Sequence, residues 1–321
     1  MIRTAIFGCG NLGRGTLRAI LRSEDEKAVG VFTRRERAEV ISEGNVSVYS
    51  ANDILSFENL IDVLYVCGGS ADDLPTLTPF LAEHFNVVDS FDRHSEIGAH
   101  LENTKKAATK GRKLALVSAG WDPGIFSVVR LAAKAVFPNG SAATFWGEGI
   151  SQGHSEAVRR IKGVKDAIQV TIPIKEAVEA AKNGRIIRSD NSLTHKRHCY
   201  VAAEEGADRG RIEREIKTMP DYFACYDTQV DFVSEGELYA RFPSMYHGGL
   251  VTASSNENRS EAKMCFELSM KSNPDFTGAV LAAYGRAVFA AAKRGRTGVL
   301  TVCDIPLADM LPPSIDKLSF L

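Results

Sequence analysis

The sequence predicts an α/β fold in which a doubly wound parallel sheet is followed by a second, α+β domain. Two observations predict this fold. Residues 1–120 alternate short apolar runs with amphipathic stretches, which is typical of parallel strands joined by crossover helices. From Ala142 to about Lys271 the apolar residues more often alternate with polar ones, which indicates an open mixed or antiparallel sheet with helices on one face.

The elements of the first domain follow one another as strand and helix. Its strands are predicted from short apolar runs and cover residues 3–7, 28–32, 46–49, 63–67, 86–89 and 113–118. Its helices are predicted from amphipathic stretches and cover residues 12–22, 74–83 and 96–110. Right-handed crossovers place the strand ends at one edge of the sheet, where ligands are expected.

The second domain begins with a helix signal. Asp122 followed by Pro123 supplies an N-cap acceptor and a proline for the first helical position, which predicts a helix over 125–137. Alternation predicts strands at 169–172, 198–202, 228–232 and 263–270. A long helix at 276–294 and a strand at 298–302 are expected to return to the first domain. We therefore expect one domain at 1–121 completed by 274–321, and another at 122–273.

Composition narrows the class of protein. The 321 residues are 44% hydrophobic and 25% charged, with a formal net charge of -1. This balance gives no general attraction to nucleic acid or to a membrane surface, so we expect neither as a partner. No apolar stretch approaches the ~20 residues of a membrane span and no export signal precedes the first strand, so we expect a cytoplasmic protein.

The cysteines suggest neither a metal site nor a disulfide framework. They form no C-x-x-C pair, which suits a reducing cytosol, and we expect them to be free and mostly buried. His195 and His198 would point to opposite faces of a strand and could not readily share an ion. The six cysteines are Cys9, Cys67, Cys199, Cys225, Cys265 and Cys303.

Residues 4–13, TAIFGCGNLG, predict a dinucleotide site. The apolar run and the three glycines that follow match the strand, tight turn and helix start of a Rossmann-type unit. In such a unit the glycines let the backbone approach a pyrophosphate at the helix N-terminus.

The next strand end indicates which dinucleotide is bound. An NAD site carries Asp or Glu at this position for the ribose hydroxyls, whereas this chain carries Thr33, Arg34 and Arg35. A guanidinium binds a 2'-phosphate through paired hydrogen bonds, so the predicted cofactor is NADP. The alternative is a basic helix start on a solvated surface.

Other predicted cofactor contacts lie in the loops that follow the later strands. The complete predicted set is Gly8, Cys9, Gly10, Asn11, Leu12, Gly13, Thr33, Arg34, Arg35, Cys67, Gly68, Gly69, Ser70, Ser90, Phe91, Asp92, Ala119, Gly120, Trp121, Asp122 and Pro123.

Several segments together resemble the meso-diaminopimelate dehydrogenase family. They agree with it in order and spacing along the chain. The segments are GCGNLG, FTRR, CGGSADDLP at 67–75, DSFDRH at 89–94, SAGWDPGIFS at 118–127, TFWGEGISQGHS at 144–155, THKRHC at 194–199, TMPDYF at 218–223 and SNPDFT at 272–277. The resemblance implies a homodimer that oxidatively deaminates the D-centre of meso-2,6-diaminopimelate with NADP. The products are ammonia and L-2-amino-6-oxopimelate, which cyclises to tetrahydrodipicolinate, and the reverse reaction makes a lysine and peptidoglycan precursor.

By this resemblance, Asp92 and Asp122 hold the reacting amine and are the predicted catalytic pair. The residue types suit the reaction. Removing hydride from a carbon that bears an amine leaves an iminium cation, which a nearby carboxylate stabilises. The alternatives are that Asp122 only caps a helix and that Asp92 only forms a turn.

The resemblance also implies anchors for the rest of the substrate. Trp146 lines the D-centre, with Gln152 and Gly153 in the same wall. The distal L-amino-acid end is held by four residues, of which the arginine suits a carboxylate. These four are Thr171, Arg197, His247 and Asn273. Alternatively, Trp146 is a core residue, Thr171 an ordinary strand residue and Arg197 a solvated charge.

One segment departs from the family pattern. Where the family commonly has Gly-Met-Pro-His-Gly-Gly, residues 244–249 read SMYHGG. Tyr246 in place of proline relaxes the backbone just before His247 and could alter how that histidine meets the substrate.

Two other functions remain open from the residues themselves. Another two-domain NADP-dependent reductase, acting on an imine, a semialdehyde or a different D-amino acid, could share the fold. Such enzymes often use a catalytic lysine or histidine, and the loops at 67–75, 89–94 and 118–124 contain no lysine. A non-catalytic nucleotide sensor would not need Asp92, Asp122, Trp146 and Arg197 together.

Overall fold

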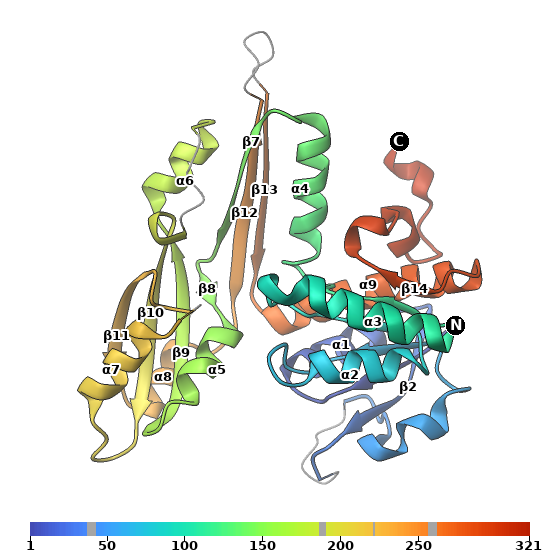
Figure 1. Cartoon of the computed structure of the whole chain (residues 1–321), viewed down its shortest axis with the longest axis horizontal. Coiled ribbons are helices and arrows are strands. Elements are labelled where there is room, and N and C mark those ends of the chain that lie inside the picture. Colours follow the sequence, from blue (N-terminus) through green and yellow to red (C-terminus); the bar gives the residue numbers. More distant parts are fainter. Residues whose placement is uncertain (37–42, 186–190, 221, 256–261) are drawn as a thin grey trace. The chain divides into compact units, whose positions relative to one another are not determined.

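The chain folds into two compact units. The computed structural model describes residues 1–36, 43–185, 191–220, 222–255 and 262–321 (Figure 1). Unit 1 comprises Met1–Val128 with Pro274–Leu321, and unit 2 comprises Val129–Asn273. Residues 122–128, which we expected in the second domain, belong to unit 1. Helix α4 (Ile125–Val136) begins there because Ile125 and Val128 pack against the core of unit 1.

Unit 1 contains a seven-stranded parallel sheet in the order β14-β6-β5-β4-β1-β2-β3. The predicted doubly wound sheet is confirmed. Its strands are β1 (Ile2–Phe7), β2 (Glu26–Thr33), β3 (Val48–Ser50), β4 (Val63–Val66), β5 (Val87–Asp89), β6 (Leu114–Leu116) and β14 (Gly298–Leu300).

Helices cover both faces of this sheet. On one face, α1 (Asn11–Leu21) and α9 (Asn273–Lys293) bury apolar side chains against the strands. On the other face lie α2 (Leu74–Ala82) and α3 (Ile97–Gly111), which run side by side (Figure 1). Helices α1 and α9 approach closely, since a Cβ on Gly278 would lie 2.3 Å from the carbonyl carbon of Gly15. These layers hold the strand ends, and therefore the loops that follow them, in fixed positions.

A buried carboxylate joins α9 to the amino end of the sheet. Tyr65 donates a hydrogen bond from its hydroxyl to Glu26 Oε2 over 2.7 Å, and Arg286 Nη2 lies 3.5 Å from Glu26 Oε1. Arg286 also binds Asp25, with Nε 2.9 Å from Oδ2. Burial raises the pKa of Glu26 to about 7, although the hydrogen bond from Tyr65 and the charge of Arg286 act in the opposite direction.

We expect Glu26→Gln to change how stability depends on pH. Between the unfolded pKa near 4.5 and the folded pKa near 7, the folded chain binds more protons than the unfolded chain, so Glu26 makes stability fall as pH rises. The fall is roughly 1.4 kcal/mol per pH unit. Urea unfolding at pH 5 and pH 7 measures it: the variant should gain stability relative to the parent as pH rises. If the free energies of unfolding of the variant and the parent differed by the same amount at both pH values, this account would be contradicted.

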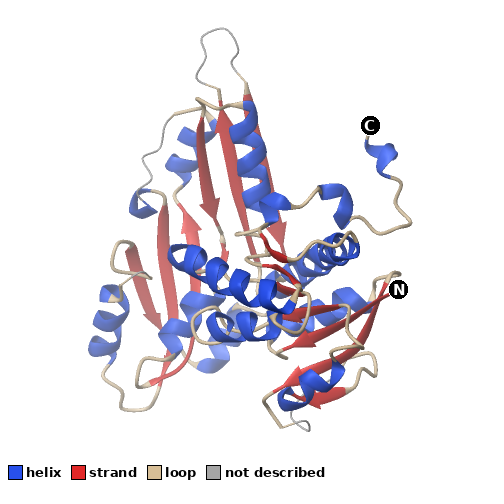
Figure 2. Ribbon diagram, turned by 45° about the vertical axis from the view of Figure 1, so that its right-hand side comes forward, coloured by secondary structure: helices blue, strands red, loops and turns tan. Residues whose placement is uncertain are grey.

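Unit 2 contains two sheets, visible as separate groups of strands in Figure 2. The predicted mixed or antiparallel arrangement is confirmed, and its division into two sheets is a finding of the structure. The antiparallel sheet consists of β7 (Ser141–Trp146), β12 (His247–Ser254) and β13 (Lys263–Met270). The mixed sheet consists of β8 (Gly149–Ile150), β9 (Val164–Pro173), β10 (His195–Ala203) and β11 (Asp227–Phe232), with β10 and β11 parallel.

Helices pack on both faces of the mixed sheet, so the expectation of helices on one face is wrong. On one face, α5 (Gln152–Arg159) and α7 (Arg209–Thr218) cover Cys199 and Val201. On the other face, α8 (Glu235–Arg241) packs through Leu238 against Tyr200 and Ala202. Both sets of alternate β10 side chains are apolar enough to be covered, which period-two alternation alone does not reveal.

The remaining elements are short. Helix α6 (Lys175–Lys182) packs on the antiparallel sheet through Ala181. Short 3-10 helices cover Ala51–Phe57, His94–Glu96, Asn191–Leu193, Val302–Asp304, Leu307–Met310 and Lys317–Phe320. No helix within the described ranges combines the length and the apolar character that crossing a membrane requires.

The cysteines are less buried than we expected. All six are free, but Cys225, Cys265 and Cys303 are exposed, whereas the other three are buried. The expectation that most are buried is therefore wrong. Cys265 lies on β13, where most residues are exposed, and Cys225 and Cys303 lie outside the strands.

Candidate active site

The glycine-rich turn between β1 and α1 has a shape that fits a dinucleotide. Gly8 has a φ of +104°, and a Cβ on it would lie 2.6 Å from the carbonyl oxygen of Cys67. A Cβ on Gly13 would lie 2.0 Å from the oxygen of Gly8. Gly10, just before the first helical residue Asn11, has nothing within 4 Å of its Cβ position. Packing therefore requires two of the glycines, and the third leaves room for a pyrophosphate at the helix N-terminus.

The basic residues after β2 lie beside the loop that follows β4. Thr33 ends β2, and its hydroxyl accepts a hydrogen bond from the backbone N–H of Arg35 over 3.1 Å. Arg34 Nη2 lies 2.6 Å from Asp73 Oδ1, and the arginine side chain is 65% exposed. A largely exposed guanidinium at the carboxyl edge of the sheet has donors to offer to a phosphate.

Residues 67–70 form the loop that follows β4. Burial raises the pKa of Cys67 to about 12, so its thiol stays neutral and is no nucleophile. Ser70 accepts a hydrogen bond on Oγ from the backbone N–H of Asp92 over 3.2 Å. Cys9, also predicted to contact the cofactor, is buried in the core, so only its backbone can face a ligand.

The two predicted catalytic aspartates follow neighbouring strands. Asp92 comes after β5 and Asp122 after β6, and these strands pair in parallel. Asp92 is exposed and Asp122 is half-buried. Because the carboxyl ends of parallel strands meet at one edge, both carboxylates lie along the edge that carries the Gly8 turn.

The loop around Asp122 is a tight turn. Trp121 and Gly124 form an antiparallel bridge, and α4 begins only at Ile125. The expected N-cap role of Asp122, with Pro123 in the first helical position, is therefore wrong. The bridge closes a turn ahead of the helix and separates both residues from its first turn.

In unit 2, Arg197 and Thr171 form a buried polar pair on paired strands. They lie opposite each other on β10 and β9, and Arg197 Nη1 donates to Thr171 Oγ1 over 2.5 Å. The guanidinium carbon lies 4.2 Å from the centre of the Tyr226 ring. Arg197 Nε is buried and has no hydrogen-bond partner among the described residues. A buried guanidinium with an unused donor suits a carboxylate ligand.

Trp146, at the end of β7, is held by His195. The backbone N–H of Trp146 donates to His195 Nε2 over 2.9 Å, and the two rings lie 5.3 Å apart. Thr194 Oγ1 lies 2.8 Å from the other imidazole nitrogen. His198, by contrast, lies on the opposite face of β10 and pairs with Asp231 over 2.8 Å. The two histidines therefore point apart, as predicted.

His247 begins β12 and is buried against Gly149. A Cβ on Gly149 would lie 2.4 Å from the Cα of His247, so only glycine permits this approach. Burial lowers the pKa of His247 to about 4, with the charge of Arg197 acting in the same direction. The imidazole is therefore neutral near pH 7.

The backbone before His247 is held despite the absence of proline. Tyr246 accepts a hydrogen bond on its carbonyl oxygen from the N–H of Ile150 over 2.9 Å, and its side chain packs in the apolar cluster beneath α8. The preceding residue, Met245, accepts a hydrogen bond from the N–H of Asn273 over 2.8 Å. These hydrogen bonds and the packing of Tyr246 therefore restrict the backbone before His247, which is part of what a proline would do there.

Sequence reasoning missed His154. It lies on α5, two residues after Gln152 and next to Gly153, the two predicted wall residues. Its Nδ1 is 2.7 Å from Oγ of Ser151, the N-cap residue of the helix. The signal was present, because His154 belongs to the segment that we singled out at 144–155, but a lone histidine is indistinguishable there from a capping partner.

Three neutral histidines therefore accompany Arg197. Burial, together with the charge of Arg197, lowers the pKa of His154 to about 3 and that of His195 to about 4. With His247 also neutral, Arg197 supplies the formal positive charge of this cluster near pH 7. Asp221, in the TMPDYF segment, lies outside the described residues.

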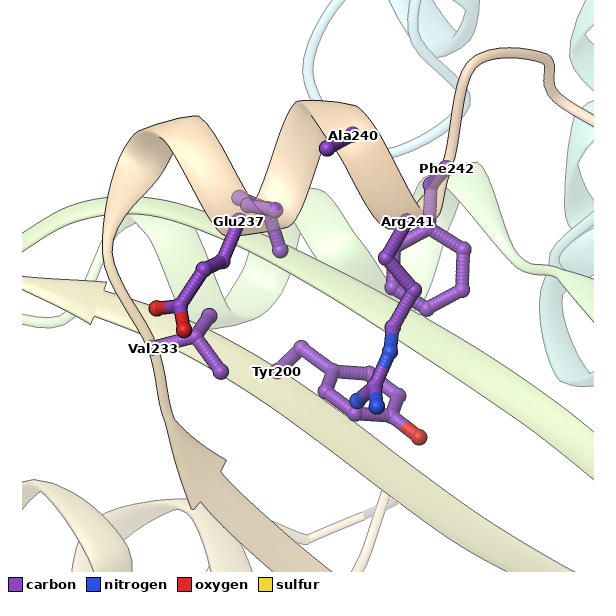
Figure 3. A pocket seen from close by; sticks show the side chains of 7 residues that line it. Tyr200, Val233, Glu237, Ala240, Arg241 and Phe242 are labelled. Atoms are coloured by element: carbon purple, nitrogen blue, oxygen red, sulfur yellow. The ribbon is translucent and has the colours of Figure 1, made fainter.

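A separate cavity of about 270 Å³ lies on the other face of β10 (Figure 3). The guanidinium of Arg241 lies over the ring of Tyr200, with 4.8 Å from its carbon to the ring centre. Because side chains alternate along a strand, Tyr200 and Arg197 point to opposite faces. None of the predicted site residues lines this cavity.

Comparison with known proteins identifies close relatives. Residues 120–272 match the family model described as the diaminopimelic acid dehydrogenase C-terminal domain. The meso-diaminopimelate D-dehydrogenase of Lysinibacillus sphaericus is 46% identical over 318 residues, which cover 99% of this chain and 98% of the relative.

Solved structures agree with these sequence matches. The diaminopimelate dehydrogenase of Corynebacterium glutamicum, in complex with DAP, superposes with a TM-score of 0.93 at 38% identity, covering 99% of this chain and 98% of that one. An engineered D-amino acid dehydrogenase bound to NADP+ superposes with a TM-score of 0.91 at 37% identity, with the same coverage.

Proposed function

This chain belongs to the meso-diaminopimelate D-dehydrogenase family, and from this premise we propose how its residues carry out the family reaction. The reaction is the reversible, NADP-dependent oxidative deamination of the D-centre of meso-2,6-diaminopimelate. It yields ammonia and L-2-amino-6-oxopimelate, which cyclises to tetrahydrodipicolinate. The observation that carries the assignment is the pair of aspartates at the carboxyl ends of β5 and β6, beside a dinucleotide turn.

The aspartates are assigned to the amine that reacts. The chemistry that NADP supplies when bound is acceptance of a hydride. Asp92 and Asp122 orient the amino group and stabilise the positive charge that develops as the carbon–nitrogen bond becomes an iminium. A pair of carboxylates suits a cationic transition state, whereas reductases of carbonyl groups need a proton donor at this place.

Residues of unit 2 are assigned to the rest of the substrate. Arg197, with its unused Nε donor, takes the distal carboxylate, and Thr171 fixes the guanidinium. The neutral histidine His247 and the amide of Asn273 suit the distal ammonium and carboxylate through hydrogen bonds. Trp146 takes the apolar carbon chain near the D-centre, with Gln152 and Gly153 in the same wall.

One assay tests the reaction. Purified protein, NADP and each diaminopimelate isomer are mixed, and reduced cofactor is followed by absorbance. We expect turnover with the meso isomer and none with the LL isomer, which lacks a D-centre. Absence of turnover with every isomer, in protein that binds NADP, would overturn the proposal.

Cofactor preference is tested by Arg34→Ala. Loss of a charge-assisted contact of about 1.5–3 kcal/mol should raise KM for NADP by roughly 10- to 100-fold. KM for NAD should change by less than about threefold, because NAD carries no 2'-phosphate. Arg296→Ala, which removes an exposed arginine before β14, is the control. An equal rise of KM for both cofactors would argue against a phosphate contact at Arg34.

We also propose that the chain acts as a cytoplasmic homodimer. Unit 2 exposes large apolar side chains that a second copy could cover, namely Leu131, Val136 and Phe266. Phe266 lies on β13, an outer strand of the antiparallel sheet. An outer strand with exposed apolar residues is a surface that proteins usually cover.

A further inference from the structure

A buried carboxylate beneath the two aspartate loops is bound by four donors. Asp89, the last residue of β5, is 0% exposed. Its Oδ2 accepts hydrogen bonds from Thr78 Oγ1 over 2.8 Å and from His100 Nε2 over 2.6 Å. Its Oδ1 accepts from the backbone N–H groups of Phe91 over 3.2 Å and Ser118 over 2.8 Å. The carboxylate thus uses both oxygens fully, as a buried charge must.

The two backbone donors belong to the loops that carry the aspartates. Phe91 immediately precedes Asp92, and Ser118 begins the turn that leads to Asp122. We infer that Asp89 is a positioning residue that fixes these two loops relative to each other, and through them the two carboxylates that hold the reacting amine. We call the hydrogen bonds from the backbone N–H groups of Phe91 and Ser118 to the Asp89 carboxylate the clamp. The clamp is a property of the fold, whereas its consequence in catalysis rests on the proposed function.

The backbone of Ser118 shows why a clamp is needed. This residue has a φ of +59°, in the left-handed region that a non-glycine residue rarely adopts. Such a conformation persists only where its surroundings enforce it. Asp89 does so twice, because its side chain binds the N–H of Ser118 and its carbonyl oxygen binds the N–H of Ala119 over 2.8 Å.

His100 supports the other loop. Its ring stacks on Phe91, with 4.2 Å between ring centres and 15° between planes, while its Nε2 donates to Asp89. Its Nδ1 is buried and has no hydrogen-bond partner in the part of the chain that the structure describes. A carboxylate at position 89 therefore fixes the imidazole with its proton on Nε2.

Two substitutions distinguish loss of the clamp from a general loss of stability. Asp89→Asn keeps an oxygen that can accept from both backbone groups, but its amide N–H groups face Thr78 and His100. To accept from the amide, His100 must move its proton to the unpartnered Nδ1, so this variant should lose stability while it keeps the loops in place. Asp89→Ala removes the acceptor for both loops, so this variant should lose stability and should also lose the fixed position of the two loops.

The first readout is independent of turnover. In the protein without substrate, amide hydrogen exchange at Phe91 and Ser118 should accelerate by more than about tenfold in Asp89→Ala and change little in Asp89→Asn. Tyr65→Phe serves as the control for destabilisation, because it removes a buried hydrogen bond to Glu26 at the other end of the sheet. Exchange at the two amides that is equally fast in the control and in Asp89→Ala would overturn the clamp.

The second readout is kinetic. Displacing a reacting group by about 1 Å costs on the order of 10²-fold in rate, so kcat per NADP-binding site should fall by about that factor in Asp89→Ala. It should stay within about threefold of the parent in Asp89→Asn and in Tyr65→Phe. The isotope effect with substrate deuterated at the D-carbon should rise in Asp89→Ala, because hydride transfer becomes slower relative to product release.

These outcomes remain separable if one variant or one premise fails. If Asp89→Ala does not fold, Asp89→Ser keeps a polar side chain that is too short to bind both amides, and the same losses are expected. A parent protein that shows no turnover would sink the proposed function, while the exchange data would still decide the clamp. A kcat in Asp89→Ala or Asp89→Ser within about threefold of the parent would overturn the positioning role.

Discussion

Asp122→Asn should lower kcat for meso-diaminopimelate by roughly 10²- to 10³-fold while the affinity for NADP changes by less than about threefold. The substitution keeps the shape of the side chain and removes its charge. Loss of one electrostatic contact that acts on developing charge costs about 2.7–4 kcal/mol of transition-state stabilisation. The turn at Trp121–Gly124, which the backbone bridge closes, should persist in the variant.

Stopped-flow single turnovers and a separate NADP titration measure the two effects. Glu102→Gln, which neutralises an exposed carboxylate on α3, is the matched control and should behave like the parent. Asp92→Asn should resemble Asp122→Asn, and the double variant should lose less than the product of the two single losses, because both groups act on one amine. Retention of kcat in Asp122→Asn would leave the residue with a structural role only.

The parallel sheet was predictable because its signals are local. Each strand is an apolar run that ends in glycine or a polar residue, and crossover chirality then fixes where the ends gather. The positions of Gly8, Thr33, Asp92 and Asp122 along the carboxyl edge follow from that alone. The roles of the two aspartates came instead from a resemblance among several segments.

The features that sequence reasoning missed depend on contacts between distant residues. The pairing of β7 with β12 divides unit 2 into two sheets, and no period in either strand reveals its partner. The signal of Asp122 and Pro123 for a helix start was overridden by a turn that ends one residue before α4. Asp89 looked like an ordinary polar strand end, since its four donors come from separate segments of unit 1.

Arg197→Gln should raise KM for meso-diaminopimelate by about 10²- to 10³-fold with a smaller effect on kcat. Removing a buried group that binds a charged partner costs about 2–5 kcal/mol, and the distal carboxylate is remote from the carbon that reacts. The KM of Arg197→Lys should fall between that of the parent and that of Arg197→Gln, because an ammonium keeps the charge but cannot offer the paired donors of a guanidinium. Steady-state kinetics with varied substrate at saturating NADP measure all three proteins.

A second expected effect of Arg197→Gln, on the pKa values of three histidines, identifies the cause of the rise in KM. The charge of Arg197 lowers the pKa of His154, His195 and His247, so its removal should raise all three pKa values while burial still holds them below 6.5. Histidine resonances followed by NMR from pH 3 to pH 7 in the substrate-free protein report this directly. A rise in KM without any change in these titrations would mean that the guanidinium is farther from the histidines than the structure places it. A change in the titrations without a rise in KM would remove the distal carboxylate from Arg197, because the charge would then shape the cluster without binding the substrate.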